Sequence, residues 1–218
     1  MDKKEVIEKT IDFVKQNLKN VDSGHDWFHI YRVWKLAKAI AEKERGADLF
    51  IVELGTLLHD IADYKFHAGN EEIAPQMVGD FLTSLQVDSK AIVHVQDIIR
   101  NVSYKGAVYV QKFKSKELDI VQDADRLDAM GAIGIARTFN YGGFKNRLIY
   151  DPTIKPNPNM TTDEYKKWDA PSVNHFYEKL LLLKDKMNTK TGKKLAESRH
   201  KFMEKYLEEF HKEWEVNL

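Results

Sequence analysis

Two ionisable residues, His59 and Asp60, directly follow an almost wholly apolar stretch at residues 49–58. Burying an imidazole or a carboxylate at the end of such a stretch is costly unless another group pairs with it. One divalent metal ion would satisfy both groups. The chain offers further ligands of the same kind on either side, His29 upstream and Asp125 downstream. We therefore predict a metal site built from these four side chains.

Two imidazoles and two carboxylates form a mixed nitrogen and oxygen ligand set. Mg²⁺ and Ca²⁺ prefer oxygen ligands alone, whereas the mixed set suits first-row transition metals. We expect one Mn²⁺ ion, with Ni²⁺, Co²⁺, Fe²⁺, Zn²⁺ and Mg²⁺ as alternatives. Four protein ligands on an octahedral ion leave two positions for water or a phosphate oxygen, and an open position distinguishes a catalytic site from a structural one. The set thus predicts phosphoryl chemistry, in which the metal activates water.

Taken singly, these residues have simpler interpretations. A His-Asp dipeptide arises often by chance, a histidine on an apolar border such as His29 is usually a core residue, and the acidic residues between positions 123 and 128 fit a solvated helix face. Their combination and order favour the metal site. A metal that only stabilises the fold is a further alternative; a chelator would then unfold the protein.

Helical periodicity dominates the chain, because apolar residues recur at intervals of three and four. We predict helices over residues 4–18, 26–44, 49–61, 70–85, 89–102, 118–139, 172–187 and 193–214. Asp48 should cap the third of these, and residues 107–113 could form one short strand. The fold class is therefore all-α, with residues 1–218 forming a single domain. Its metal core would span about residues 22–140, with C-terminal helices at about 170–216 packing on it.

Composition excludes several classes of protein. Hydrophobic residues make up 43% of the chain, enough for a sizeable core, and 34 basic residues balance 34 acidic ones. A zero net charge argues against nucleic-acid and membrane-surface binding. The absence of cysteine excludes disulfides and thiolate metal sites. Without a signal peptide or an apolar run of about 18 residues, we expect a cytoplasmic protein.

The order His…His-Asp…Asp resembles the HD-domain metal-dependent phosphohydrolases, which are helical bundles. The resemblance is sharpest in GHDWFHIYRV at residues 24–33, LLHDIAD at 57–63 and QDADRLDA at 122–129. It implies the same four ligands, His29, His59, Asp60 and Asp125. The segment at residues 172–187 resembles a small bacterial subgroup that is similar to HD pyrophosphohydrolases of nucleoside triphosphates. Nothing resembles the GYP motif of cyclic-dinucleotide phosphodiesterases.

Catalysis and substrate binding need further polar groups. Asp63 follows Asp60 by three residues, and the resemblance implies that an acidic residue here orients or deprotonates the attacking water. The ligands and a divalent ion nearly cancel in charge, so cationic side chains must neutralise a polyphosphate. The candidates near the motifs are Arg32, Lys65, Lys105, His25 and Arg126. For any one of them a local or solvated role is the alternative.

Our preferred hypothesis is an enzyme that cleaves a nucleoside or deoxynucleoside triphosphate to the monophosphate and pyrophosphate. A 5′-nucleotidase, a guanosine tetraphosphate hydrolase and a non-catalytic nucleotide-binding module are the alternatives. The apolar stripe from Leu195 to Trp214 predicts a packing helix, with a homodimer contact as the alternative. We assign no role to His94 or His175.

Overall fold

Every regular element in the described part of the chain is helical. A computed structural model describes residues 1–18, 26–61, 72–103, 111, 113–161, 164 and 169–216, and none of these lies in a strand. The prediction of an all-α fold is confirmed. The strand predicted at residues 107–113 lies mostly outside the described residues. No described helix combines the length and apolar character that crossing a membrane requires.

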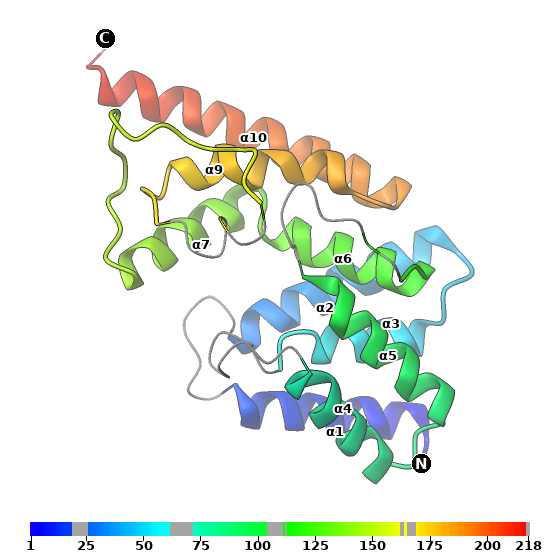
Figure 1. The fold of residues 1–218 in the computed structure, drawn as a ribbon. Helices are drawn as coiled ribbons and strands as arrows, with labels where there is room; N and C mark the ends of the chain where they lie inside the picture. The colour runs from blue at the N-terminus through cyan, green and yellow to red at the C-terminus, as the bar shows by residue number, and fades with distance from the viewer. Residues whose placement is uncertain are drawn as a thin grey trace. The chain divides into compact units, whose positions relative to one another are not determined.

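Contacts within the chain define two compact units (Figure 1). The first comprises residues 1–104 and 110–124, and the second residues 105–109 and 125–218. The first unit contains α1 (Lys3–Asn17), α2 (Trp27–Glu44), α3 (Leu49–Leu58), α4 (Ile73–Ser84), α5 (Ser89–Val102) and most of α6 (Lys116–Asp128). The second contains the last turn of α6, α7 (Gly131–Phe144), α9 (Asn174–Glu178), the 3₁₀ helix η2 (Leu180–Lys186) and α10 (Lys190–Trp214). The single domain over residues 1–218 stays a prediction.

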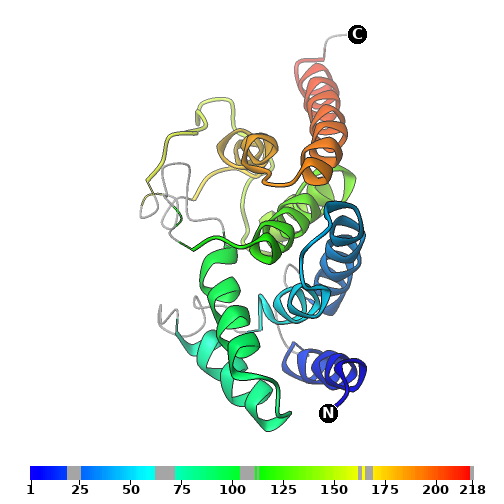
Figure 2. The same ribbon diagram turned by 90° about the vertical axis from the view of Figure 1, so that its right-hand side faces the viewer.

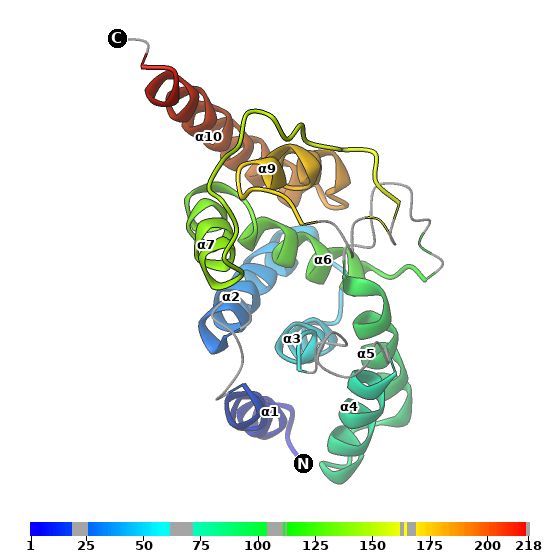
Figure 3. The same ribbon diagram turned by 60° about the vertical axis from the view of Figure 1, so that its left-hand side comes forward.

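The centre of the first unit is α3, which packs against α1, α2 and α5. Figure 3 views α3 along its axis, with these three helices around it, while α4 and α5 lie side by side as a helical pair (Figure 2). The helix is apolar nearly all round, so neighbours must cover several of its faces. Leu54, Leu57 and Leu58 are fully buried, and each contributes about 1.5–3 kcal/mol of hydrophobic stabilisation.

Gly55 lets α3 approach its neighbours closely. A Cβ atom at this position would lie 3.1 Å from Ile98 Cγ2 on α5 and 3.6 Å from Val121 Cγ2 on α6. The first of these distances is already tighter than ordinary van der Waals contact. The contact surface at Gly55 therefore has no room for a larger side chain, and it lies one helical turn before His59.

The single helix predicted at residues 118–139 is wrong, because α6 ends at Asp128 and α7 begins at Gly131. Gly131 has a φ of 72°, in the left-handed region that only glycine adopts readily. The helix predicted at residues 172–187 is likewise divided, into α9 and η2. The first break matters for function, since it makes the turn containing Asp125 the end of a helix.

In the second unit, α10 packs against α7 and η2. Three aromatic rings from α7, α9 and α10 meet there: Phe139, Phe176 and Tyr206 have centroids 5.9–6.1 Å apart. Of the apolar stripe on α10, Met203 and Leu207 are buried, whereas Phe202 and Trp214 are exposed, so the packing helix is confirmed for only part of the stripe. The homodimer contact stays a prediction.

His175 on α9 makes the second unit sensitive to acid. Burial, with Lys179 and Arg147 nearby, lowers the pKa of its imidazole from 6.5 to about 3. Between these values the unfolded chain binds a proton that the folded chain does not, so stability is complete above pH 6.5 and is lost as the pH falls toward 3. We expect the free energy of unfolding to fall over this range by up to about 1.4 kcal/mol per pH unit.

This loss should be smaller in His175→Gln, which has no titrating side chain at this position. The check is urea unfolding of both proteins at pH 7.0, 5.5 and 4.5. Identical slopes against pH would contradict the assignment of the acid sensitivity to His175.

Candidate metal centre

The first turn of α2 places His29 in the interior of the first unit. Asp26 caps this helix, and its Oδ1 accepts a hydrogen bond of 2.8 Å from the backbone N–H of His29. The histidine is 1% exposed, and the neighbouring Ile30 and Val33 are fully buried. The apolar face of α2 thus carries the imidazole inward, as the sequence predicts.

The exit of α3 presents His59 and Asp60. The helix ends at Leu58, so both residues lie in the turn that follows rather than in the predicted helix to residue 61. His59 is 5% exposed, and its Nδ1 lies 2.7 Å from the backbone carbonyl oxygen of Thr56. A carbonyl can only accept, so Nδ1 carries the proton and Nε2 keeps its lone pair. This is the arrangement by which proteins orient a metal-binding imidazole.

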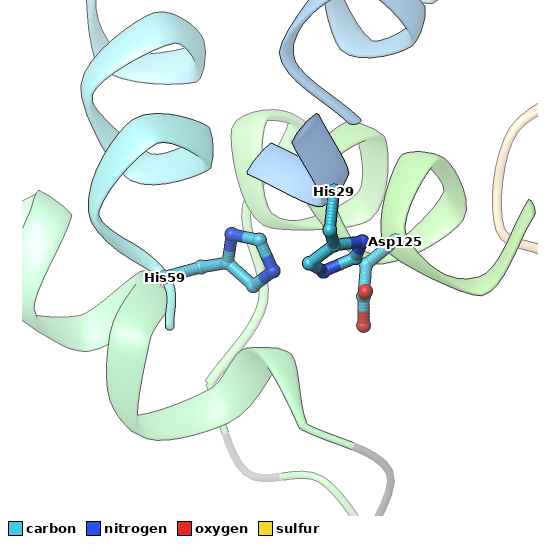
Figure 4. A group of neighbouring side chains, drawn as sticks. All are labelled: His29, His59 and Asp125. Carbon is cyan, nitrogen blue, oxygen red and sulfur yellow. The ribbon is translucent and has the colours of Figure 1, made fainter. Parts of the chain in front are cut away.

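Three ligand groups from separate segments come together at this point. One ligand atom from each of His29, His59 and Asp125 lies within 4.8 Å of the other two. Figure 4 shows the two imidazole rings with their edges toward each other and the Asp125 carboxylate beside His29; the ring centroids are 5.4 Å apart and the ring planes are inclined by 67°. Asp125 is the residue of α6 that directly follows the first unit, which ends on this helix at residue 124. The helix continues without a break through Asp125. Asp60 is not one of the three groups, but its Oδ2 lies 3.5 Å from His29 Nε2 and 3.6 Å from His59 Nε2.

These four side chains fit a divalent metal ion. Ligand atoms bound about 2.0–2.2 Å from an ion are at most about 4.4 Å apart, so the observed limit of 4.8 Å needs only a small inward shift. Two buried imidazoles and two carboxylates bring a charge of −2, which a divalent ion balances. The Asp60 side chain is 23% exposed, so solvent reaches the group on at least that side. Solvent access is what a hydrolytic site requires.

Most of the other predicted site residues lie outside the described residues: Asp63, Lys65, Lys105 and His25. Their assignments stay predictions. Arg32 is half-buried on α2, one turn after His29. The guanidinium of Arg126 donates through Nη1 to the backbone carbonyl of Lys186. This contact is structural, and a substrate role for Arg126 also stays a prediction.

His94 lies in a different environment from the three-ligand group. Its Nε2 is 2.9 Å from Ser115 Oγ and 3.6 Å from Glu117 Oε2, at the start of α6. Both contacts use the same ring nitrogen, so they do not form a relay through the two nitrogens of the ring. They tie α5 to the beginning of α6.

The contact that supports His29 can be recognised from the sequence, whereas the contact that orients His59 cannot. The cap at Asp26 follows a recognisable pattern, an acidic residue just before an apolar helical repeat. The Thr56 carbonyl that orients His59 is a backbone group, and no residue type identifies it.

Comparisons with known proteins agree with this geometry. A family model described as HD domain matches residues 27–130, a span that contains all four predicted ligands. Uncharacterized protein YpgQ from Bacillus subtilis is 40% identical over 202 residues, which are 92% of this chain and 90% of that protein. The crystal structure of an HD-superfamily hydrolase from Bacillus thuringiensis is 49% identical, covers 99% of this chain and 100% of its own, and superposes with a TM-score of 0.77. The structure of Bacillus subtilis YpgQ in complex with ADP is 36% identical, covers 98% of this chain and 97% of its own, and has a TM-score of 0.76.

Proposed function

This chain belongs to the HD-domain family of hydrolases, and from that premise we propose that it is a metal-dependent phosphohydrolase acting on nucleotides. His29, His59, Asp60 and Asp125 would hold one divalent ion, with Mn²⁺ preferred. When bound there, the ion polarises a phosphoryl oxygen and lowers the pKa of water. The observation that carries the proposal is the approach of three ligand atoms, from distant parts of the chain, to within 4.8 Å of one another.

We assign the remaining chemistry to acidic and basic groups near the ligands. Asp63, three residues after Asp60, orients or deprotonates the attacking water. Arg32, on the same helix as His29, binds phosphate together with Lys65 and Lys105. These cations are needed because the ligands and a divalent ion together are close to neutral and leave the charge of a polyphosphate uncompensated.

The preferred substrate is a nucleoside or deoxynucleoside triphosphate. Water would attack the α-phosphorus, the bond from that phosphorus to the α–β bridging oxygen would break, and pyrophosphate would leave. A relative that is 36% identical has been crystallised with ADP, which supports a nucleotide as the ligand. The resemblance of residues 172–187 to HD pyrophosphohydrolases favours the triphosphate over a monophosphate.

Product analysis tests this proposal. We expect the protein with Mn²⁺ to convert a triphosphate to a monophosphate and pyrophosphate, observed by ³¹P NMR. Nucleoside monophosphates and guanosine tetraphosphate, supplied separately, test the two alternative enzymes. Orthophosphate released from a monophosphate, without pyrophosphate from any triphosphate, would identify a 5′-nucleotidase instead.

Asp60→Ala separates an enzyme from a binding module. We expect this variant to lose turnover while its circular dichroism spectrum and its thermal midpoint without metal remain those of the parent. Retention of full turnover would show that Asp60 is dispensable. Absence of turnover in the parent with every metal and nucleotide tried would favour the binding module.

A further inference from the structure

Three elements of the second unit are bound to the last turn of α6, the turn that contains Asp125. Arg199 of α10 donates through Nη1 to the backbone carbonyl of Leu127. Arg126 reaches from the turn itself to the carbonyl of Lys186 in η2. Arg137 of α7 donates through Nη1 to Asp128 Oδ2 at 2.8 Å. The end of α6 is thereby bound to α7, η2 and α10.

The contacts of Asp128 are largely shielded from solvent. The Asp128 side chain is 5% exposed and that of Arg137 is 23% exposed, so their ion pair is only weakly screened. Burial lowers the pKa of Arg199, and the charge of Asp128 opposes that shift. Asp128 therefore faces two guanidinium groups, one from α7 and one from α10. Breaking such a buried pair on one side leaves an uncompensated charge and is strongly destabilising.

Arg199 also suits the electrostatics of the helix end. The last carbonyl groups of a helix lack intrahelical partners and carry partial negative charge. The Leu127 carbonyl accepts a 3.0 Å hydrogen bond from the backbone N–H of Met130 in addition to that from Arg199. Gly131, with its φ of 72°, leaves space for the arginine, because a Cβ there would lie 3.1 Å from Arg199 Cγ.

We propose that Asp128, Arg137 and Arg199 are positioning residues that hold the Asp125 carboxylate in place for metal binding. Asp125 and Asp128 are three residues apart, so they lie on neighbouring positions of the same helical face. The guanidinium of Arg199, on α10, caps the last turn of α6, and the ion pair between Asp128 and Arg137 anchors that turn to α7. Both contacts restrict the movement of the turn. In this way α10, which holds none of the predicted ligands, affects the affinity for the metal. The inference rests on the proposed metal centre.

The test is Mn²⁺ affinity, measured without nucleotide from the electron paramagnetic resonance signal of free Mn²⁺. We expect Arg199→Gln to weaken binding by about 10- to 100-fold, the range seen when groups that support a metal ligand are removed. Arg199→Lys restores a cation beside the Leu127 carbonyl and should recover most of this loss. Asp128→Asn, which keeps the size of the side chain, should also weaken binding and serves if Arg199→Gln does not fold.

Arg147→Gln is the matched control. Arg147 is in the same unit and forms an ion pair with the exposed Asp169 at 2.7 Å, so its loss removes a guanidinium without touching α6. Its Mn²⁺ affinity should stay within about twofold of the parent, a change below 0.5 kcal/mol in binding. Folding of each variant is followed by thermal unfolding in chelator.

Two results would overturn different conclusions. Parent-like Mn²⁺ affinity in folded Arg199→Gln and Asp128→Asn would overturn the positioning role alone. Failure of the parent protein to bind Mn²⁺ or any related divalent ion would overturn the metal centre, and the positioning role with it. Equal losses in Arg147→Gln and Arg199→Gln would also refute positioning, because they would indicate a general effect of charge.

Discussion

Asp125→Asn is expected to reduce metal-dependent hydrolysis by at least about 10²- to 10³-fold, because the amide cannot supply the anionic oxygen that holds the metal. The substitution keeps the size of the side chain, so the fold should survive. We expect the free energy of unfolding without metal to change by no more than about 0.5 kcal/mol. Steady-state rates over a range of Mn²⁺ concentrations separate weaker metal binding from slower chemistry.

Asp119→Asn is the control for this prediction. It is the same change on the same helix, six residues earlier, which places it on a different face of α6. Its rate and its metal dependence should match those of the parent. Parent-like turnover of Asp125→Asn at low Mn²⁺ concentration would remove Asp125 from the metal centre and leave the two histidines and Asp60.

Gly55→Leu is expected to lower the free energy of unfolding by about 1–3 kcal/mol, the cost of inserting a side chain into a packed core. The new side chain would meet Ile98 and Val121 where a Cβ alone is already in contact. Since α3 must then move away from α5 and α6, His59 moves relative to Asp125, and Mn²⁺ affinity should fall as well. Urea unfolding gives the first quantity and paramagnetic resonance the second.

Gly143→Leu provides the matched comparison. Gly143 is also helical, but a Cβ at this position would meet nothing within 4 Å. Leucine has a higher helix propensity than glycine, so stability should stay the same or rise by up to about 1 kcal/mol. Equal destabilisation at both glycines would contradict the argument from close packing at Gly55.

Helical periodicity predicted most of the fold. The range predicted for α5 agrees with the structure, and those for α1, α2, α4 and α10 differ by at most three residues at either end. The errors lie at helix breaks. Periodicity continues across residues 129–131 because both α6 and α7 are amphipathic, while the break depends on a backbone angle at Gly131 that the surrounding structure sets. The sequence analysis also missed the division of residues 172–187 into α9 and η2.

The candidate site was also predicted only in part from the sequence. Residue types and their order predicted His29, His59 and Asp125, whose ligand atoms the structure brings to within 4.8 Å of one another, since a buried imidazole or carboxylate needs a partner wherever the chain places it. Their role as metal ligands stays a prediction. Asp63, Lys65, Lys105 and His25 lie outside the described residues, so their roles still rest on the sequence.

By itself, the sequence determined the all-α class and predicted the ligand types of the proposed metal centre, because both follow from local patterns of polarity and charge. Only the tertiary structure decided which nitrogen of His59 faces the ligands, since a backbone carbonyl makes that choice. It also decided that arginines from α7 and α10 hold the turn with Asp125. Those contacts join residues 9 and 72 positions apart in the chain, and the spacing of residue types carries no information about such distant pairs.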